Sequence, residues 1–293
     1  MHGTAQLPVV VHWPGGPGVP AEGAPCPCPP ALPEFVLPAV TRSASLLGAL
    51  LDDSALDVEL AGSVLALDPG LAFGTLQLAN RERRREPVWE LPLALVAAGR
   101  DELQYLVYRT PQIQSFPDVT RRSCLQLLVL NAALRACAAH FLAQKLGSCP
   151  PRKAFLAGLL LELPALMTLG LSQPPGCRAK LLSAMCRSLP APMVTAAMAR
   201  TDRAGDEPRD PLLALVLIAD QLLQARNGAA ASSGMREELA ARPLWSCWRE
   251  TGARRRSALL GACEALLGWA SANLYRMQPW EFVQALEQAR SWE

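Results

Sequence analysis

The sequence predicts an all-α protein, and three observations support this fold class. Apolar residues recur at helical spacing along most of the chain from Glu34 onward. Helix boundary signals accompany them: Asp68-Pro69 places an N-cap residue before a proline at the first helical position, and Gly147 follows the longest helical run. No stretch alternates apolar and polar residues in the way that a half-buried strand does.

The expected helices follow one another with short breaks. An apolar face begins at Val36, Val40 and Leu47, and Asp57 is the expected N-cap of a helix through Leu67. The next helix starts at Asp68-Pro69, and residues 81–86 form a charged loop. After it we expect helices over 89–98, 102–108 beyond Gly99, 118–146, 153–169, 177–188, 191–201, 212–226, and two within 235–293 joined near Gly252.

Composition indicates a sizeable core and a divided chain. Of the 293 residues, 51% are hydrophobic and 18% are charged, which argues against disorder for most of the length. We expect a flexible Pro/Gly-rich tail over 1–30, a main domain over 31–228, and a helical extension over 229–293. The break at 111–117 divides the main domain into an N-terminal half, 31–115, and a second half, 116–228.

Charge, cysteine content and hydropathy suggest a compartment. The formal net charge of +2 provides no general attraction to nucleic acid or to an anionic membrane, so neither is an expected partner. Cysteines within apolar helical runs are expected to be buried free thiols in a reducing compartment: Cys124, Cys137, Cys177, Cys186 and Cys263. The apolar runs are interrupted before about 18 residues, and no secretory signal is visible. These features predict a cytoplasmic protein.

The most informative segment runs from Lys153 to Leu166 and reads KAFLAGLLLELPAL. It resembles the signature helix of HD-type phosphohydrolases, which reads apolar-Ala-Gly-apolar-apolar-His-Asp-apolar-Gly. Leu161 stands in place of the histidine, Glu162 in place of the aspartate, and Pro164 in place of the final glycine. A proline inside a helix frees the carbonyl four residues earlier, here that of Leu160, and should kink the helix.

Further blocks occur in the order and spacing of one family. These are the segments 31–37 (ALPEFVL), 67–71 (LDPGL), 77–80 (QLAN), 94–99 (ALVAAG) and 217–220 (LIAD). Together with the 153–166 helix they resemble the HDOD family, the HD-related output domain of bacterial signalling proteins, over about residues 31–228. The resemblance implies an all-helical fold of two subdomains, and we call residues 116–228 the HD-like half.

The resemblance also implies where a metal centre would lie. HD hydrolases bring several imidazoles and carboxylates together on one or two divalent metals. Here Arg122 takes the first histidine position, Leu161 and Glu162 replace the His-Asp pair, and Asp220 is retained. The chain has three histidines, which are His2, His12 and His140. We therefore expect no catalytic residue, no metal and no cofactor.

What remains is a vestigial cleft formed by Arg122, Leu161, Glu162 and Asp220. One hypothesis is that Glu162 pairs with a nearby arginine, and Arg122 is one candidate, whose charge would balance Glu162 and Asp220 where the metal would lie. The other is that Glu162 points into a residual cavity. The weaker alternative is that Glu162 and Asp220 hold magnesium, which accepts carboxylate and water ligands. Cys137 and His140, three residues apart on a helix, were weighed as a nucleophile and base and are not favoured.

Several surface residues are candidates for binding a partner. Arg83, Arg84 and Arg85 form a basic run, and a second run is 254–256. Five of the seven tryptophans lie in the last fifty residues, among them Trp245 and Trp248. Tryptophan is favoured at interface hot spots. The competing interpretations are that the arginines are solvated loop charges and that the tryptophans seal the extension against the main body.

These patterns favour a non-catalytic bacterial signalling module that acts by binding a protein partner. One alternative is a small-ligand sensor that binds a nucleotide or cyclic dinucleotide in the vestigial cleft, with arginines contacting phosphate. Another is a divergent metal-dependent phosphohydrolase.

Overall fold

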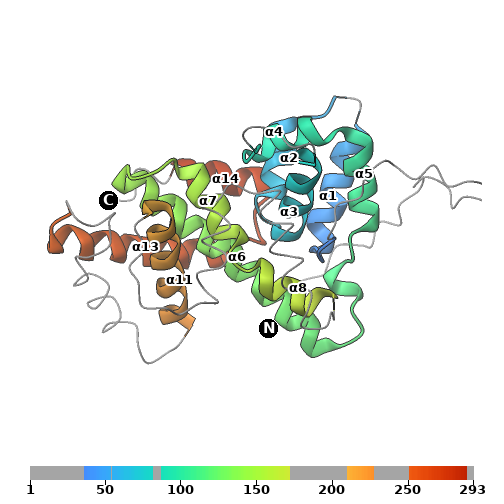
Figure 1. Ribbon diagram of the computed structural model, residues 1–293. Coiled ribbons are helices and arrows are strands. Elements are labelled where there is room, and N and C mark those ends of the chain that lie inside the picture. The colour runs from blue at the N-terminus through green and yellow to red at the C-terminus, as the bar shows by residue number, and fades with distance from the viewer. Residues whose placement is uncertain (1–35, 54, 82–86, 172–209, 228–250, 289–293) are drawn as a thin grey trace, which may run out of the picture.

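The computed structural model describes residues 36–53, 55–81, 87–171, 210–227 and 251–288 (Figure 1). Within these ranges the backbone forms α-helices, one 3₁₀ turn and a single isolated β-bridge, and no β-strand. The all-α class is therefore confirmed. The predicted tail over 1–30, the helices over 177–188 and 191–201, and the residues Arg83, Arg84, Arg85, Trp245 and Trp248 lie outside the described residues.

The described residues of the N-terminal half form a compact group of five helices, coloured blue to teal in Figure 1. Their bounds are α1 (Thr41–Asp52), α2 (Val58–Leu65), α3 (Pro69–Ala79), α4 (Leu91–Ala98) and α5 (Arg100–Arg109). Asp57 caps α2 by accepting a hydrogen bond from the Leu60 N–H at 2.9 Å, as its position predicts. Gly99 separates α4 from α5 with a φ of 87°, a conformation that glycine adopts without steric cost.

The first residues of the domain are not helical, which corrects the expected helix start. Residues 36–40 are extended, and α1 begins only at Thr41. The Ala39 N–H donates to the Pro111 carbonyl at 2.9 Å, and the Ile113 N–H donates to the Ala39 carbonyl at 2.8 Å. Pro38 also lacks the N–H that a helix would use. The segment therefore pairs with the break at 111–117 instead of continuing α1 backward.

The HD-like half is built on one long central helix. Its elements are the 3₁₀ turn η1 (Ile113–Ser115) at its border and the helices α6 (Val119–Leu146), α7 (Pro151–Leu160), α8 (Leu163–Leu171) and α11 (Pro211–Asn227). Asp118 caps α6 by accepting from the backbone N–H groups of Thr120 and Arg121, and Gly147 ends it in the left-handed conformation at φ 64°. Both boundaries agree with the sequence prediction.

A break interrupts the 153–169 helix where Pro164 predicts it. α7 ends at Leu160, residues 161–162 form a turn, and α8 begins at Leu163. The Leu160 carbonyl is the group that Pro164 deprives of its helical N–H partner. Glu162 is placed in this turn, so the proline contributes to the position of a site residue.

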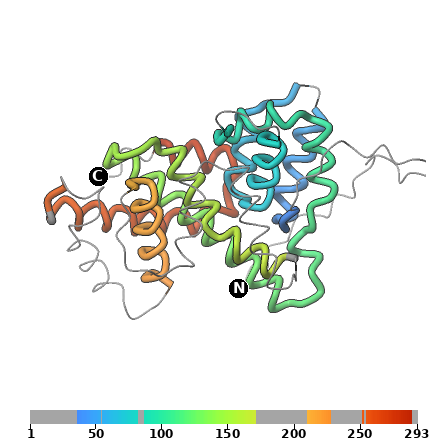
Figure 2. The backbone as a smooth tube through the Cα atoms, viewed as in Figure 1, coloured from blue at the N-terminus to red at the C-terminus, as the bar shows by residue number. Residues whose placement is uncertain are grey.

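The described part of the extension contains two helices after Gly252, where one was expected. α13 (Ala253–Asn273) and α14 (Pro279–Gln288) are separated by a turn in which the Arg276 N–H donates to the Asn273 carbonyl. α13 packs against α6 and α11, whereas α14 packs against α2. Figure 2 shows the red backbone of α14 returning beside the blue N-terminal group. The extension thus contacts both halves of the domain.

Side chains near the start of α14 attach the extension to the main body and join its two helices. Arg42 on α1 donates to the carbonyls of Tyr275 and Met277 at 2.8 and 3.2 Å. Trp269 of α13 stacks on the buried ring of Phe282, with ring centroids 5.2 Å apart. This contact joins two helices of the extension, so the interpretation that its tryptophans seal it against the main body stays a prediction.

The hydrophobic core runs from the N-terminal helices through α6 and α7 to α13 and α14. Two described stretches, Val119–Leu146 and Pro151–Gly170, are long and apolar enough to cross a membrane, which corrects the expectation that no segment reaches that length. In each, 72% of the apolar window is buried inside the protein. Such burial is typical of core helices, so this similarity in length and composition is weak evidence for a membrane span.

Candidate functional site

The candidate site lies where α6 and α7 pack most closely. Gly158 on α7 faces the α6 backbone, and a Cβ atom there would lie 3.0 Å from the Ala136 Cα and 3.1 Å from the Arg135 carbonyl oxygen. Such an approach is tighter than ordinary van der Waals contact. The glycine of the signature helix therefore allows α7 to lie against α6 at this level, which brings Glu162 within reach of α6.

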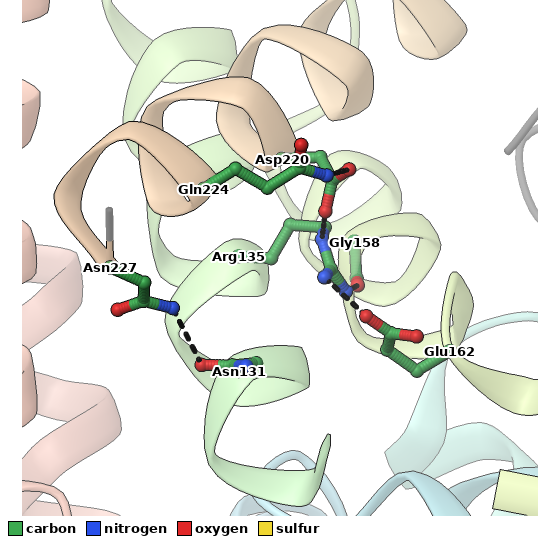
Figure 3. A network of polar contacts seen from close by, with 7 residues as sticks. All are labelled: Asn131, Arg135, Gly158, Glu162, Asp220, Gln224 and Asn227. Atoms are coloured by element: carbon green, nitrogen blue, oxygen red, sulfur yellow. Dashed lines mark hydrogen bonds and ion pairs between the residues drawn. The ribbon is translucent and has the colours of Figure 1, made fainter. Parts of the chain in front are cut away.

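Arg135 of α6 joins two carboxylates that come from two other helices (Figure 3). Its Nε donates to Asp220 Oδ1 on α11 at 2.7 Å, and its Nη2 donates to Glu162 Oε1 after α7 at 2.7 Å. We call Arg135, Glu162 and Asp220 the Arg135 cluster. The side chains of Arg135, Glu162 and Asp220 are only 1%, 4% and 6% exposed, respectively.

Further groups support the cluster. Gln224, one turn after Asp220 on α11, donates its Nε2 to Asp220 Oδ2 at 2.6 Å. A longer contact of 3.5 Å joins Arg135 Nη1 to the Gly158 carbonyl. Figure 3 also shows Asn131 and Asn227 in contact between α6 and α11 one turn away. The guanidinium thereby joins α6, α7 and α11 through charged or polar groups at their common centre.

Burial determines the electrostatics of the cluster. Charges taken out of water carry a large desolvation cost, which is offset only by close, well-directed opposite charges. Arginine suits this position because it is permanently charged and presents its donors in a rigid fork. One cation beside two anions leaves the cluster one unit negative, with the positive charge lying between the two carboxylates.

The structure brings Glu162 and Asp220 together as expected, but the cation that joins them is not Arg122. Arg122 lies thirteen residues before Arg135 on α6, about 20 Å along the helix axis. Its Nη1 lies 3.4 Å from the Phe116 carbonyl instead. The expected Arg122 pairing is therefore wrong, because both residues share one long straight helix and only the later one faces α7 and α11.

Leu161, which stands at the histidine position, is buried in the main hydrophobic core at 1% exposure. Its side chain takes part in packing, and it has no lone pair to offer a metal. Of the four residues predicted for the vestigial cleft, Glu162 and Asp220 both contact Arg135. Leu161 precedes Glu162 in the chain, and Arg122 is remote from this cluster.

A sequence signal for Arg135 was present and was missed. It is the single charged residue among the apolar and small residues 132–143 of α6. Arginine is almost never fully buried unless it is paired. A lone arginine inside a run that must be buried therefore requires carboxylate partners, and Glu162 and Asp220 are similarly isolated among apolar residues.

The donor set does not fit the metal centre of HD hydrolases. Among the described residues, no group of three or more His, Cys, Asp or Glu side chains converges in a way that could hold a metal ion. In addition, the Arg135 guanidinium lies against the carboxylate oxygens that a cation would need. A divalent ion would have to displace the guanidinium or bind despite its electrostatic repulsion.

The environments of the other candidate groups do not favour reactivity. Cys137 and His140 are both buried on α6, and burial raises the pKa of the Cys137 thiol to about 12, which opposes a role as nucleophile. Cys263 is also buried as predicted, whereas Cys124 is exposed, because it lies on the open side of the first turns of α6.

A second buried carboxylate lies at the N-terminus of α3. The Asp68 side chain accepts backbone hydrogen bonds from Val40, Gly70 and Leu71 at 2.8 to 3.1 Å. Burial raises the pKa of Asp68 to about 6, although these donors act in the opposite direction. The Asp-Pro block identified in the sequence is thus an N-cap that also holds the extended segment before α1.

The family comparison agrees with the resemblance seen in the sequence. The family model for the HDOD domain matches residues 37–182. The chain therefore contains an HDOD domain. The match includes Arg135 and Glu162, whereas Asp220 on α11 lies beyond its end. A search of curated proteins found no match.

One of two similar solved structures supports the fold. The MmoQ response regulator from Methylococcus capsulatus str. Bath superposes with a TM-score of 0.54 at 18% identity, covering 72% of this chain and 95% of that one. A second structure of MmoQ, fragment 20–298, gives a TM-score of 0.40 at 17% identity and covers 86% of this chain and 90% of that one. At such identities the first similarity shows a shared fold.

Proposed function

We propose that this chain is a non-catalytic signalling module of the HDOD type that acts by binding a protein partner. The HDOD domain supports a signalling or regulatory role. The observation that favours a non-catalytic module is the Arg135 cluster: a guanidinium lies between the two carboxylates that the HD resemblance assigns to the metal site. A side chain of the protein thus supplies a positive charge between these carboxylates without a metal.

The alternative of a nucleotide sensor in the same cleft has less support. Arg135 is the group that would contact a phosphate, but its Nε and Nη2 donate to Asp220 and Glu162 at 2.7 Å. A phosphate would have to compete with two buried carboxylates for these donors and would meet their negative charge. We therefore do not propose nucleotide binding at the Arg135 cluster.

Metal analysis and hydrolysis assays test the non-catalytic part. We expect purified protein to contain no stoichiometric iron, manganese or zinc, and bis-p-nitrophenyl phosphate not to be hydrolysed when these metals are added. The matched variant is Glu162→Gln, which preserves shape but removes a carboxylate. Stoichiometric metal together with hydrolysis that is lost in Glu162→Gln would contradict the proposal.

Affinity capture tests the partner-binding part. The full chain should retain a specific protein, and substitution of Arg83, Arg84 and Arg85, or of Trp245 and Trp248, by serine should abolish its retention. The matched control replaces the exposed Arg109 and Arg276, which belong to none of the predicted surfaces, by serine. Equal retention by all variants would exclude both predicted surfaces. Full-length variants are preferable to truncation, because α13 and α14 contribute Leu260, Cys263, Phe282 and Leu286 to the core.

A further inference from the structure

A cleft lies where the N-terminal half, the HD-like half and the last helix meet. Two adjoining cavities of about 250 and 450 Å³ form it, and they share five residues, namely Trp89, Glu90, His140, Arg152 and Glu287. None of these belongs to the Arg135 cluster. Volumes of a few hundred Å³ are typical of small-molecule sites, which also favour junctions between structural units.

Aromatic and apolar side chains form much of the cleft. Trp89, before α4, and Trp280, on α14, are both half-buried and line the first cavity. His140 on α6 is buried and meets Phe155 of α7 edge to face, with ring centroids 6.2 Å apart. Indole rings exposed to a cavity offer flat, electron-rich faces. The cleft therefore suits an occupant with an aromatic or apolar body.

The charges around the cleft are mainly negative. Glu59, Glu90 and Glu287 line the first cavity together with one cation, Arg152. A second cation, Lys153, lies beside the cleft with its Nζ over the Trp89 ring, 4.4 Å from the centroid. Arg152 pairs with Glu287 at 3.4 Å. In the described part of the chain, no ion pair involves Glu59 or Glu90. The carboxylates of Glu59 and Glu90 are therefore available to interact with a ligand in the cleft.

A buried hydrogen-bond acceptor in the second cavity also favours a ligand that is not an anion. The Gln144 side chain lines this cavity, and its Oε1 is buried and accepts no hydrogen bond from any described residue. A buried acceptor without a donor costs free energy until a donor reaches it. A ligand that carries N–H or O–H groups would satisfy this oxygen, whereas an anion would not.

We propose that this cleft binds a small organic cation that has an aromatic body. The indole face of Trp280, and the face of Trp89 that Lys153 does not cover, attract both the ring and the positive charge. Glu59 and Glu90 complement that charge and disfavour phosphates, sulfonates and carboxylates. The inference does not depend on the signalling function proposed above, and it concerns different residues.

Titration with benzylamine, which is protonated at pH 7, tests the proposal. The probe combines a benzene ring with a positive charge and N–H donors; benzyl alcohol serves as the neutral control and benzenesulfonate as the anionic control. We expect the cation to quench tryptophan fluorescence saturably and to raise the hydrogen-exchange protection of α14, which contributes Trp280 and Glu287. Affinity should fall from the cation to the alcohol to the sulfonate.

Variants separate specific from general binding. Glu90→Gln should weaken cation binding by roughly fivefold, the effect of one nearby charge in water, and Trp280→Leu should weaken it by about fivefold or more. Asp101→Asn, an exposed carboxylate on α5 outside the cleft, should leave binding unchanged. Non-saturable quenching, equal affinity for cation and sulfonate, or equal effects of Glu90→Gln and Asp101→Asn would overturn the proposal.

Discussion

At the scale of single residues, Arg135 determines the character of the HD-like half. A buried guanidinium and two buried carboxylates are stable only as a set, because each charge has left water and depends on the others. The hydrogen bonds of 2.7 Å on both sides are in the range of charge-assisted pairs. Removal of one member should therefore lower stability much more than replacement of the whole set by apolar residues.

Arg135→Ala should lower the free energy of unfolding by about 3–5 kcal/mol, because Glu162 and Asp220 would be left buried beside each other. The measurement is urea denaturation followed by circular dichroism. The matched control is Arg122→Ala on the same helix, expected to change stability by less than about 1 kcal/mol. A larger loss in Arg122→Ala than in Arg135→Ala would contradict the assignment of Arg135 as the balancing cation.

Asp68 should make stability depend on pH. Its pKa is about 6 in the folded protein against 3.8 for the model compound, so the folded state binds the proton more tightly than the unfolded chain. The protonated form therefore stabilises the fold: the contribution is fully present below pH 4 and is lost as pH rises through 6.

Asp68→Asn tests this dependence, because asparagine also caps helices but does not titrate. Between pH 4 and 7, the unfolding free energy of the wild type minus that of Asp68→Asn should decrease as pH rises. Denaturation at matched pH values measures this difference, which cancels the other titrating groups. A difference that is flat or that increases with pH would exclude Asp68 as the source.

At the scale of helices, the glycine of the signature segment controls how closely α7 approaches α6. A methyl group at Gly158 would meet backbone atoms of Ala136 and Arg135, which cannot rotate away as a side chain could. The helices would have to separate by a few tenths of an ångström. Because Glu162 follows one turn later, this separation would also stretch its bond to Arg135.

Gly158→Ala should destabilise the protein by about 1–3 kcal/mol, the usual cost of overpacking, despite the better helix propensity of alanine. Gly268→Ala on α13 is the matched control, because its added Cβ would find only Arg226 Nη1 at 3.9 Å. That change should be neutral or stabilising by up to about 1 kcal/mol. Thermal unfolding of the two variants decides, and a stabilised Gly158→Ala would show that the helices have room to move.

At the scale of the whole molecule, the extension is part of the folded body. α13 covers α6 and α11, α14 lies on α2, and Arg42 holds the turn between the two helices. The same arrangement places Trp280 and Glu287 at the cleft. Loss of the extension would therefore expose core residues and remove one wall of the proposed ligand site.

Phe282→Ala should cost about 3–5 kcal/mol, as for other fully buried aromatic residues. Phe282 is completely buried and stacks on Trp269 of α13, so its removal leaves a cavity where α14 packs on α13. Leu93→Ala, at a residue 57% exposed on α4, should change stability by less than about 0.5 kcal/mol. Chemical denaturation of both variants is the measurement, and a neutral Phe282→Ala would mean that α14 docks without stabilising the fold.

The local features of this chain could be predicted from short stretches of sequence. The caps at Asp57, Asp68 and Asp118, the end of α6 at Gly147 and the break before Pro164 each depend on residues within one helical turn, whose stereochemistry has few solutions. The HDOD resemblance could be recognised for the same reason, since its blocks are short sequence motifs in a fixed order.

The pairing of Glu162 and Asp220 with Arg135 instead of Arg122 required the folded chain. Both arginines lie on one helix, and local preferences do not distinguish them; the choice depends on which turn of α6 faces α7 and α11. The extended segment at 36–40 and the docking of α14 on α2 are of the same kind. They arise from contacts between residues far apart in the chain, because burial and charge pairing act through space and override local propensity.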